Sequence, residues 1–159
     1  MALEDAQRTV GLVRFHAALS ERSVYLRYFQ PMKLSTRTAH ERLTRICFLD
    51  YDREMALVAE HRDRRSGQEE IIAVARLSKL HAVNEAEAAI VVSDDYQHQG
   101  LGTELYRRLA QIARDENIAR IVSTMLGENR EMRAICQKLG FRIHSDLEEQ
   151  TVKAELAVG

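Results

Sequence analysis

The sequence predicts a mixed α/β fold, in which a mixed, mostly antiparallel β-sheet is covered by helices on both faces. Apolar residues recur with helical spacing in some segments and form short β-branched runs in others. These segments follow the order helices, three strands, helix, strand, helix and two strands, which is typical of a sheet packed between helices. The 159 residues, 45% of them hydrophobic, suffice for one sizeable core. We therefore expect residues 1–159 to form a single domain.

The amino-terminal part is predicted to be helical. Leu3 to Leu19 has one apolar face, as expected for an amphipathic helix. Ser20 is a suitable N-cap for a second helix that ends near Phe29, before Pro31, and Ser35 is a suitable cap for a third. The apolar face of the first helix comprises Leu12, Phe15, His16 and Leu19, and that of the third comprises Leu43, Ile46 and Cys47.

Strands and helices are predicted for the rest of the chain from β-branched runs, apolar periodicity and glycine positions. The polar segment from Arg62 to Gln68 contains Gly67 and reads as a hairpin loop between the first two strands. The expected strands are Tyr51–Glu60, Ile71–Leu77, Ala86–Val92, Ile118–Met125, Phe141–His144 and Val152–Leu156. One expected helix follows Gly100, and another runs from Asn129 to Leu139 and stops at Gly140.

The corner between the strand Ala86–Val92 and the following helix is the most informative segment. Gly100 and Gly102 let an anion approach the backbone, and the helix directs unpaired N–H groups and its positive dipole end toward that anion. The segment lacks both the dinucleotide-fold and P-loop patterns, so a pyrophosphate held without metal is favoured over a triphosphate. A tight turn without a ligand is the alternative. Asp94 and Asp95 would oppose a phosphate, so we expect them to initiate the turn or point away.

Composition argues against several classes of partner. The formal net charge of −1 provides no large basic field for nucleic acid or an anionic membrane surface. No apolar run approaches the length of a membrane span, and the amino terminus lacks the pattern of a signal peptide. The two cysteines, Cys47 and Cys136, form no disulfide framework, and no cluster has zinc-ligand spacing. We expect a cytoplasmic protein without a metal site.

Three segments resemble one known family. The run Gln97-His98-Gln99-Gly100-Leu101-Gly102 matches the Gln/Arg-x-x-Gly-x-Gly/Ala motif of the GNAT acetyltransferase superfamily, whose loop holds the pyrophosphate of acetyl-CoA. Asn129, Met132 and the run Gln137-Lys138-Leu139-Gly140-Phe141 resemble the family's helix beside the cofactor. The runs LSERSVYLRYF, DYDREMALVA and AEAAIVVSDDYQHQGLG resemble the acetyltransferase domain of bacterial Pat-type protein-lysine acetyltransferases. Together these segments extend from about Leu19 to Ile143.

The resemblance implies a set of site residues. Glu87 matches the glutamate that serves as general base in Pat-type enzymes, although on sequence alone it also reads as a solvent-facing residue at a strand start. Glu85 is expected to lie outside the strand. The N–H of Val92 is expected to stabilise the oxyanion. The residues expected to bind acetyl-CoA are Val91, Val92, Ser93, Gln97, His98, Gln99, Gly100, Leu101, Gly102, Thr103 and Asn129.

The chain departs from the family pattern at two places. GNAT domains usually begin with a strand before the first helix, so either that strand is absent here or Thr9–Val13 is extended. Many GNAT enzymes place a general-acid tyrosine where this chain has Cys136. A small core hydrophobe is the better interpretation of that cysteine. The thiolate product would then leave without a dedicated acid or take its proton from water.

The resulting hypothesis is an acetyl-CoA-dependent N-acetyltransferase that modifies a protein lysine, for instance on an acyl-CoA synthetase. One alternative is an enzyme that acetylates a small-molecule amine. Another is a non-catalytic CoA-binding module that regulates a partner domain. The absence of the tyrosine adds weight to the module, whereas Glu87 argues against it.

Overall fold

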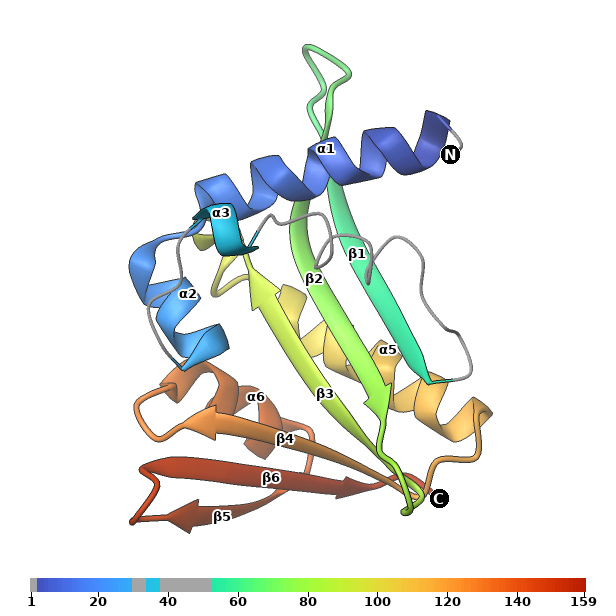
Figure 1. Ribbon diagram of the computed structural model, residues 1–159, viewed down its shortest axis with the longest axis vertical. Helices are drawn as coiled ribbons and strands as arrows, with labels where there is room; N and C mark the ends of the chain where they lie inside the picture. Colours follow the sequence, from blue (N-terminus) through green and yellow to red (C-terminus); the bar gives the residue numbers. More distant parts are fainter. Residues whose placement is uncertain (1–2, 30–33, 38–52) are drawn as a thin grey trace.

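The computed structural model describes residues 3–29, 34–37 and 53–159, and within them a six-stranded sheet lies between helices (Figure 1). The strand order is β1-β2-β3-β4-β6-β5. All neighbouring strands pair antiparallel except β3 and β4, which are parallel. The predicted fold class is therefore confirmed.

The elements agree with most of the predicted segments. The helices are α1 (Leu3–Ala18), α2 (Glu21–Tyr28), α3 (Leu34–Arg37), the 3₁₀ turn η1 (Asp94–Tyr96), α5 (Leu101–Asp115) and α6 (Arg130–Lys138). The strands are β1 (Glu54–Arg62), β2 (Glu69–Lys79), β3 (Glu85–Val92), β4 (Arg120–Leu126), β5 (Arg142–Asp146) and β6 (Thr151–Ala157). Within the described segments, no helix is both long and apolar enough to cross a membrane.

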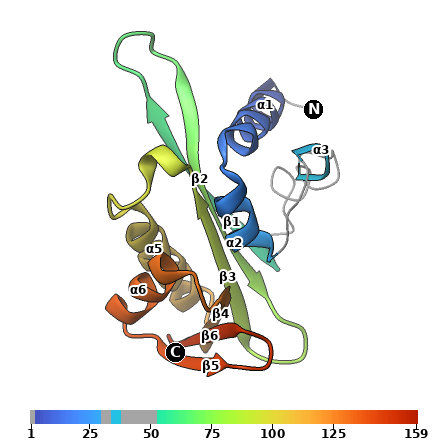
Figure 2. The same ribbon diagram turned by 90° about the vertical axis from the view of Figure 1, so that its left-hand side faces the viewer.

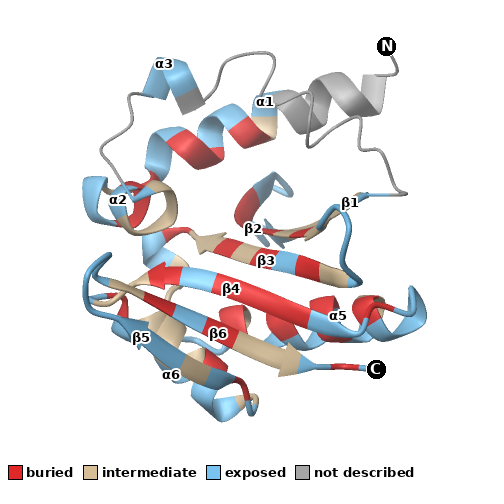
Figure 3. Cartoon of the chain, turned by 60° about the horizontal axis from the view of Figure 1, so that its bottom comes forward, coloured by how far each residue is buried: buried red, intermediate tan, exposed pale blue. Residues whose placement is uncertain are grey.

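Helices α1, α2 and α3 cover one face of the sheet, and α5 and α6 cover the other (Figures 1 and 2). On the α5 face, Leu105, Tyr106 and Leu109 pack against alternate residues of β3 such as Ala88 and Ile90. Burial is concentrated along β4 and on the inward side of α5 (Figure 3). Tyr106, which the helical spacing places at the border of the apolar stripe, is 1% exposed and belongs to this core.

The apolar face predicted for the first helix is confirmed, because Leu12, Phe15, His16 and Leu19 are all buried. Residues 9–13 are helical, so the alternative in which Thr9–Val13 is extended is wrong. Ser20 caps α2 as predicted: its Oγ accepts a hydrogen bond from the Ser23 N–H at 3.1 Å. The helix ends at Tyr28, and Phe29 adopts the left-handed conformation with φ 64°.

Two expectations for the amino-terminal half need correction. Ser35 lies inside α3 rather than before it. Glu85 lies inside β3, half-buried, with a carboxylate oxygen 3.2 Å from Nη1 of Arg120, so it is not a solvated residue outside the strand. The expected apolar residues of the third helix, Leu43, Ile46 and Cys47, lie outside the described residues, as do Tyr51 and Asp52 at the predicted start of the first strand.

The parallel pairing of β3 and β4 is short. Its register contains three residue pairs and ends where Glu87 faces Val122. Strand β3 continues to Val92, so its last five residues diverge from β4 (Figure 1). This divergence splits the sheet and provides the wall of the candidate site.

Asp94 attaches α2 to the end of β3. Its carboxylate accepts hydrogen bonds from the Ser20 N–H at 3.0 Å, the Ser20 Oγ at 2.6 Å and the Ser23 Oγ at 3.1 Å. Burial raises the pKa of Asp94, but these hydrogen bonds outweigh that effect and the net pKa is lowered. The side chain thus points toward α2, and Asp94 begins the turn η1, so the expectation that it initiates the turn is confirmed.

We predict that Asp94→Ala lowers the free energy of unfolding at neutral pH by about 1 kcal/mol, the low end for hydrogen bonds to a charged group because the carboxylate is largely exposed. The folded-state pKa is depressed, so this contribution is fully present above the unfolded pKa of about 3.9 and is lost as pH falls through the folded pKa. Urea unfolding at several pH values measures it.

The matched control is Asp95→Ala, which removes a carboxylate from the same turn. No hydrogen bond or ion pair of this carboxylate is found among the described residues. A difference between wild type and Asp94→Ala that stays constant down to pH 2 would contradict the assignment.

Candidate active site

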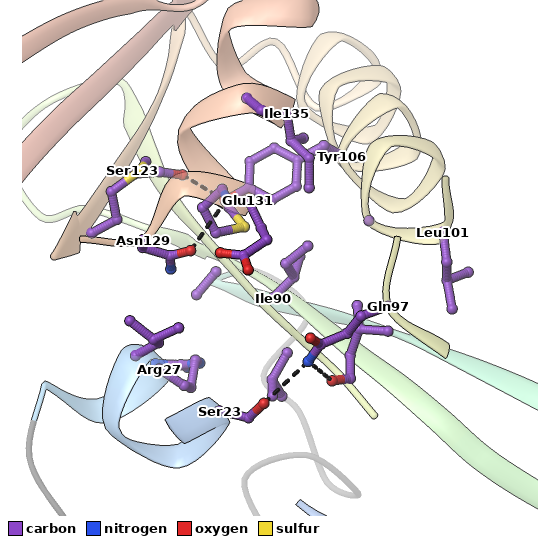
Figure 4. Close-up of a pocket in the computed structure, with 18 of the residues that line it drawn as sticks. Ser23, Arg27, Ile90, Gln97, Leu101, Tyr106, Ser123, Asn129, Glu131 and Ile135 are labelled. Atoms are coloured by element: carbon purple, nitrogen blue, oxygen red, sulfur yellow. Dashed lines mark hydrogen bonds between the residues drawn. The ribbon is translucent and has the colours of Figure 1, made fainter. Parts of the chain in front are cut away.

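A cavity of about 680 Å³ lies where β3 and β4 diverge (Figure 4). Its walls come from α2, the last part of β3, the segment from Asp94 to Thr103 at the start of α5, β4 and the first turns of α6. It therefore joins the phosphate-loop candidate to the strand that carries Glu87. The sequence predicted the residues of one wall but not that α2 forms the other.

Backbone groups of β3 alternate between β2 and the cavity. The Ser93 N–H donates to the Ile72 carbonyl at 2.7 Å, and the antiparallel register gives Val91 the same orientation toward β2. The N–H groups of Ile90 and Val92 must then point to the side from which β4 has diverged. Val91 and Val92 both line the cavity, but of the three strand residues predicted to bind a ligand through their backbone, only Val92 directs its N–H toward it. Ile90 was missed, although the two-residue period of a strand would have indicated it.

The point of divergence is closed by a buried hydrogen-bond network. The Ser123 Oγ donates to the Ala88 carbonyl at 2.8 Å, and the Tyr106 hydroxyl lies 2.8 Å from the same Oγ and 3.4 Å from the same carbonyl oxygen. Ala88 is the first β3 residue beyond the paired register, so Ser123 satisfies a carbonyl that the ladder no longer pairs. Burial raises the pKa of Tyr106 far above its usual value, so the phenol stays protonated.

The start of α5 presents free N–H groups to the cavity. Gly100 is the N-cap, with φ 84° and without a side-chain cap, and the first intrahelical bond runs from the Glu104 N–H to the Gly100 carbonyl at 3.1 Å. The N–H groups of Leu101, Gly102 and Thr103 therefore precede the first bonded turn, the arrangement that binds anions at helix N-termini. His98 also has a positive φ, of 60°.

The two glycines serve different purposes. Gly100 is exposed and a Cβ there would meet nothing, so its left-handed backbone is what favours glycine. At Gly102 a Cβ would lie 2.8 Å from Cδ1 of Ile135 and 3.1 Å from Cδ1 of Ile90. Gly102 thus permits close packing of α5 on β3 and α6, and a bulky residue there would disturb the core as well as a ligand.

The side chains of Gln97 and Gln99 form hydrogen bonds that hold the loop between β3 and α5 in place. The Gln97 Nε2 donates to the Ser23 Oγ at 3.1 Å and to the Val92 carbonyl at 3.0 Å, joining the loop to α2 and β3 (Figure 4). The Gln99 Nε2 donates to the Asp95 carbonyl at 3.2 Å. His98 lines the cavity with an exposed side chain, and Leu101, Thr103 and both glycines line it as well.

Asn129 is the N-cap of α6 and also lines the cavity. It is 7% exposed, and its Oδ1 accepts a hydrogen bond from the Met132 N–H at 3.2 Å. Its Nδ2 faces the open centre of the site (Figure 4). The capping role and the lining role that the sequence suggests are therefore compatible.

Glu87 lines the cavity from the α2 side of β3, with an exposed side chain. Arg27 of α2 lines the same wall and has its guanidinium 5.1 Å from the centre of the Tyr28 ring. Burial lowers the pKa of Arg27, while the negative charge of Glu87 acts in the opposite direction. The wall thus combines one carboxylate with one cation.

Cys136 is part of the core rather than the cavity. It is fully buried, and burial raises the pKa of its thiol to about 12. It packs as the small hydrophobe that the sequence suggests. Among the described residues, no group of three or more His, Cys, Asp or Glu side chains could hold a metal ion.

Several cavity residues were missed by sequence reasoning, because their positions depend on the packing of α2 and α6. Arg22 and Arg27 lie within the run LSERSVYLRYF, which carried the resemblance without assigning them a role. Tyr106, Ser123 and Glu131 gave no local signal that separates them from ordinary helix and strand residues.

Comparison with known proteins agrees with this architecture. The family model described as an acetyltransferase (GNAT) domain matches residues 4–142. A Pseudomonas aeruginosa protein named acetyltransferase PA5475 is 32% identical over 110 residues, which are 69% of this chain and 58% of that protein. This chain thus spans less than two thirds of that relative.

Solved structures show the same fold. The GNAT domain of S. lividans PAT has a TM-score of 0.80 and 27% identity, covering 99% of this chain and 87% of that one. The PaiA N-acetyltransferase from Thermoplasma acidophilum, solved in complex with coenzyme A, has a TM-score of 0.71 and 15% identity, covering 95% and 93%.

We predict that Ser123→Ala lowers the free energy of unfolding by about 1–2 kcal/mol, because the Ala88 carbonyl loses its shorter hydrogen bond and keeps only the 3.4 Å bond from the Tyr106 hydroxyl. Tyr106→Phe should cost less, about 0.5–1 kcal/mol, since Ser123 can still donate to Ala88. Chemical denaturation measures both. Thr124→Val, which removes an exposed hydroxyl from the same strand, is the control and should change stability little. Equal stability of Ser123→Ala and wild type would contradict the role of this network.

Proposed function

Because this chain belongs to the GNAT acetyltransferase family, we propose that it is an acetyl-CoA-dependent N-acetyltransferase whose acceptor is a protein lysine. The observation that carries the proposal is the continuity of two backbone surfaces. The free edge of β3 at Ile90 and Val92 leads directly to the free N–H groups at the start of α5. A ligand with an amide-containing arm and a pyrophosphate matches both surfaces.

Each part of acetyl-CoA has a counterpart in the cavity. The N–H groups of residues 101–103 and the left-handed Gly100 suit the pyrophosphate, since helix N-termini bind anions. The N–H groups of Ile90 and Val92 suit the pantetheine arm, which would add to β3 in the manner of a strand. Asn129 would contribute its free Nδ2 from the opposite wall. The CoA complex of the structurally similar PaiA enzyme supports the same ligand class.

The reaction requires an uncharged amine and a donor for the thioester oxygen. Lysine has a reference pKa of about 10.4, so near neutral pH a base must remove its proton. Glu87 takes that proton, directly or through one water, and the amine nitrogen then attacks the thioester carbon. The Val92 N–H stabilises the negative charge that develops on the carbonyl oxygen. As the C–S bond breaks, the amide nitrogen gives up its second proton to water and the departing thiolate takes a proton from water, because Cys136 is buried away from the cavity.

The preference for a protein acceptor is supported by two observations. The sequence runs around Glu87 and α2 resemble Pat-type protein-lysine acetyltransferases, and the GNAT domain of S. lividans PAT has a TM-score of 0.80 with this chain. Arg27 supports amine chemistry as well, because a nearby cation disfavours the ammonium form of the acceptor.

A panel of acceptors separates the proposal from its alternatives. Purified protein would be incubated with labelled acetyl-CoA and an acyl-CoA synthetase, a polyamine or no acceptor. Transfer to lysines of the protein supports the proposal, and transfer to the polyamine alone would indicate a small-amine enzyme. Binding of CoA without transfer to any acceptor would favour a regulatory CoA-binding module.

We predict that Glu87→Gln reduces turnover near neutral pH by about a hundredfold or more, the usual share of general-base catalysis. The affinity for acetyl-CoA should change little, because the proposed cofactor contacts are made by the backbone further along β3. The rate should partly recover at high pH, where more of the amine is already neutral. Initial rates from pH 6 to 10, together with calorimetric binding, measure these effects.

Glu85→Gln is the matched control, because Glu85 lies two residues away on β3 and pairs with Arg120 instead of lining the cavity. Its turnover should stay close to that of wild type. If Glu87→Gln instead matched wild type across the pH range, the base would have to be sought elsewhere.

We also predict that Asn129→Ser retains the helix cap yet weakens CoA binding several-fold, since serine caps well but lacks the Nδ2 donor. Asn129→Ala should weaken CoA binding similarly and lower stability by about 1 kcal/mol through loss of the cap. Thermal unfolding and calorimetry distinguish the two effects. Unchanged CoA affinity in Asn129→Ser would leave Asn129 with the capping role alone.

A further inference from the structure

The carboxylate of Glu131 points into the middle of the cavity, opposite Ile90 (Figure 4). Glu131 lies in the first turn of α6, where a negative charge is favourable. Its Oε1 is 3.5 Å from Nη2 of Arg22 and 4.0 Å from Nε2 of His98. Its Oε2 is buried and has no hydrogen-bond partner among the residues that the structure describes. One carboxylate therefore connects α2, the anion-binding corner and α6.

This position is unfavourable for a carboxylate in two respects. A buried acceptor without a donor carries a desolvation cost. In addition, a negative charge next to the start of α5 would repel any phosphate bound there. What favours the position is the pair of basic side chains, Arg22 and His98, which come from different elements and converge on the same oxygen.

We propose that the Glu131 carboxylate pairs with Arg22 in place of a cofactor phosphate as long as no cofactor is bound. When the cofactor binds, its phosphate displaces Glu131 and pairs with Arg22. The inference rests on the proposed acetyl-CoA site and adds Arg22 to the residues that hold the cofactor. The Glu131 carboxylate then competes with the phosphate for Arg22, so it lowers the affinity for the cofactor, and it occupies the cavity until the cofactor binds.

The strengths of the Arg22–Glu131 pair and of an Arg22–phosphate pair decide which partner Arg22 prefers. Arg22 and Glu131 form a monodentate contact with side chains that are 58% and 38% exposed, and exposed ion pairs of this kind contribute little. A guanidinium bound to phosphate forms charge-assisted, often bidentate hydrogen bonds, which are stronger. Displacement also lets Oε2 of Glu131 reach water. The exchange therefore favours the bound cofactor.

A different role for Glu131 would have the opposite effect on binding. A carboxylate in the groove could accept hydrogen bonds from the amide N–H groups of the pantetheine arm, in which case removing its charge would weaken binding of the arm. The position of Glu131 only 3.5 Å from Arg22 and 4.0 Å from His98 favours the phosphate side of the ligand. The two roles can be distinguished by using ligands with and without phosphate.

The experiment measures calorimetric affinities of wild type and Glu131→Gln for CoA and for pantetheine, which lacks every phosphate. Glu131→Gln should bind CoA about threefold more tightly, the change expected when one like charge near an anion is removed in water-like surroundings. Its affinity for pantetheine should stay the same. Glu128→Gln is the matched control, since Glu128 is an exposed acid three residues earlier that does not line the cavity.

Arg22 is tested in the Glu131→Gln background, so that loss of the ion pair cannot account for the result. Arg22→Gln should weaken CoA binding there by several-fold and leave pantetheine binding unchanged. Weaker binding of pantetheine by Glu131→Gln, unchanged CoA affinity in that variant, or no effect of Arg22→Gln would each overturn the inference. Absence of CoA binding by wild type would instead refute the proposed function.

Discussion

The early end of the β3–β4 ladder is the constraint on which the rest of the site depends. Buried backbone groups need partners, so a sheet that splits must satisfy the exposed edges in another way. At the apex Ser123 bonds to the Ala88 carbonyl, and at the far end Gln97 bonds to the Val92 carbonyl. The N–H groups between these two points remain available. The cavity thus follows a stretch of the β3 edge that has no strand partner, and a side chain bonds to the backbone carbonyl at each end of this stretch.

Helix α2 converts this split sheet into a site with two walls. Its first turn is tied to the loop after β3 through Asp94 and Gln97. The same helix carries Arg22 toward the anion-binding corner and Arg27 toward Glu87. The residues proposed to contact the cofactor and the acceptor therefore lie on one helix that is attached to the loop after β3. A displacement of α2 would therefore move both Arg22 and Arg27. The hairpin of β5 and β6 contributes no residue to the cavity lining, so changes there would leave the lining intact.

Sequence patterns predicted the elements that depend on local chemistry. Ser20 as a cap, the stripe of Leu105 and Leu109, and the glycine corner all follow from residue type and spacing. The features that were missed depend on contacts between distant segments. The hydroxyl of Tyr106 is bonded to Ser123 of a distant strand, and Glu131 of α6 is paired with Arg22 of α2. Glu85 was misplaced because its partner, Arg120, comes from a strand 35 residues away.

The alternation of backbone groups along β3 has a consequence for its dynamics. Amides that bond to β2, such as that of Ser93, exchange their hydrogen only when the ladder opens. The amides of Ile90 and Val92 lack a ladder partner on the β4 side, so in the empty protein they exchange with solvent while the strand remains folded. A single strand thus carries slow and fast amides in alternation. A ligand that pairs with β3 as proposed would slow the exchange of the Ile90 and Val92 amides alone, so hydrogen exchange along this one strand would report that the cavity is occupied.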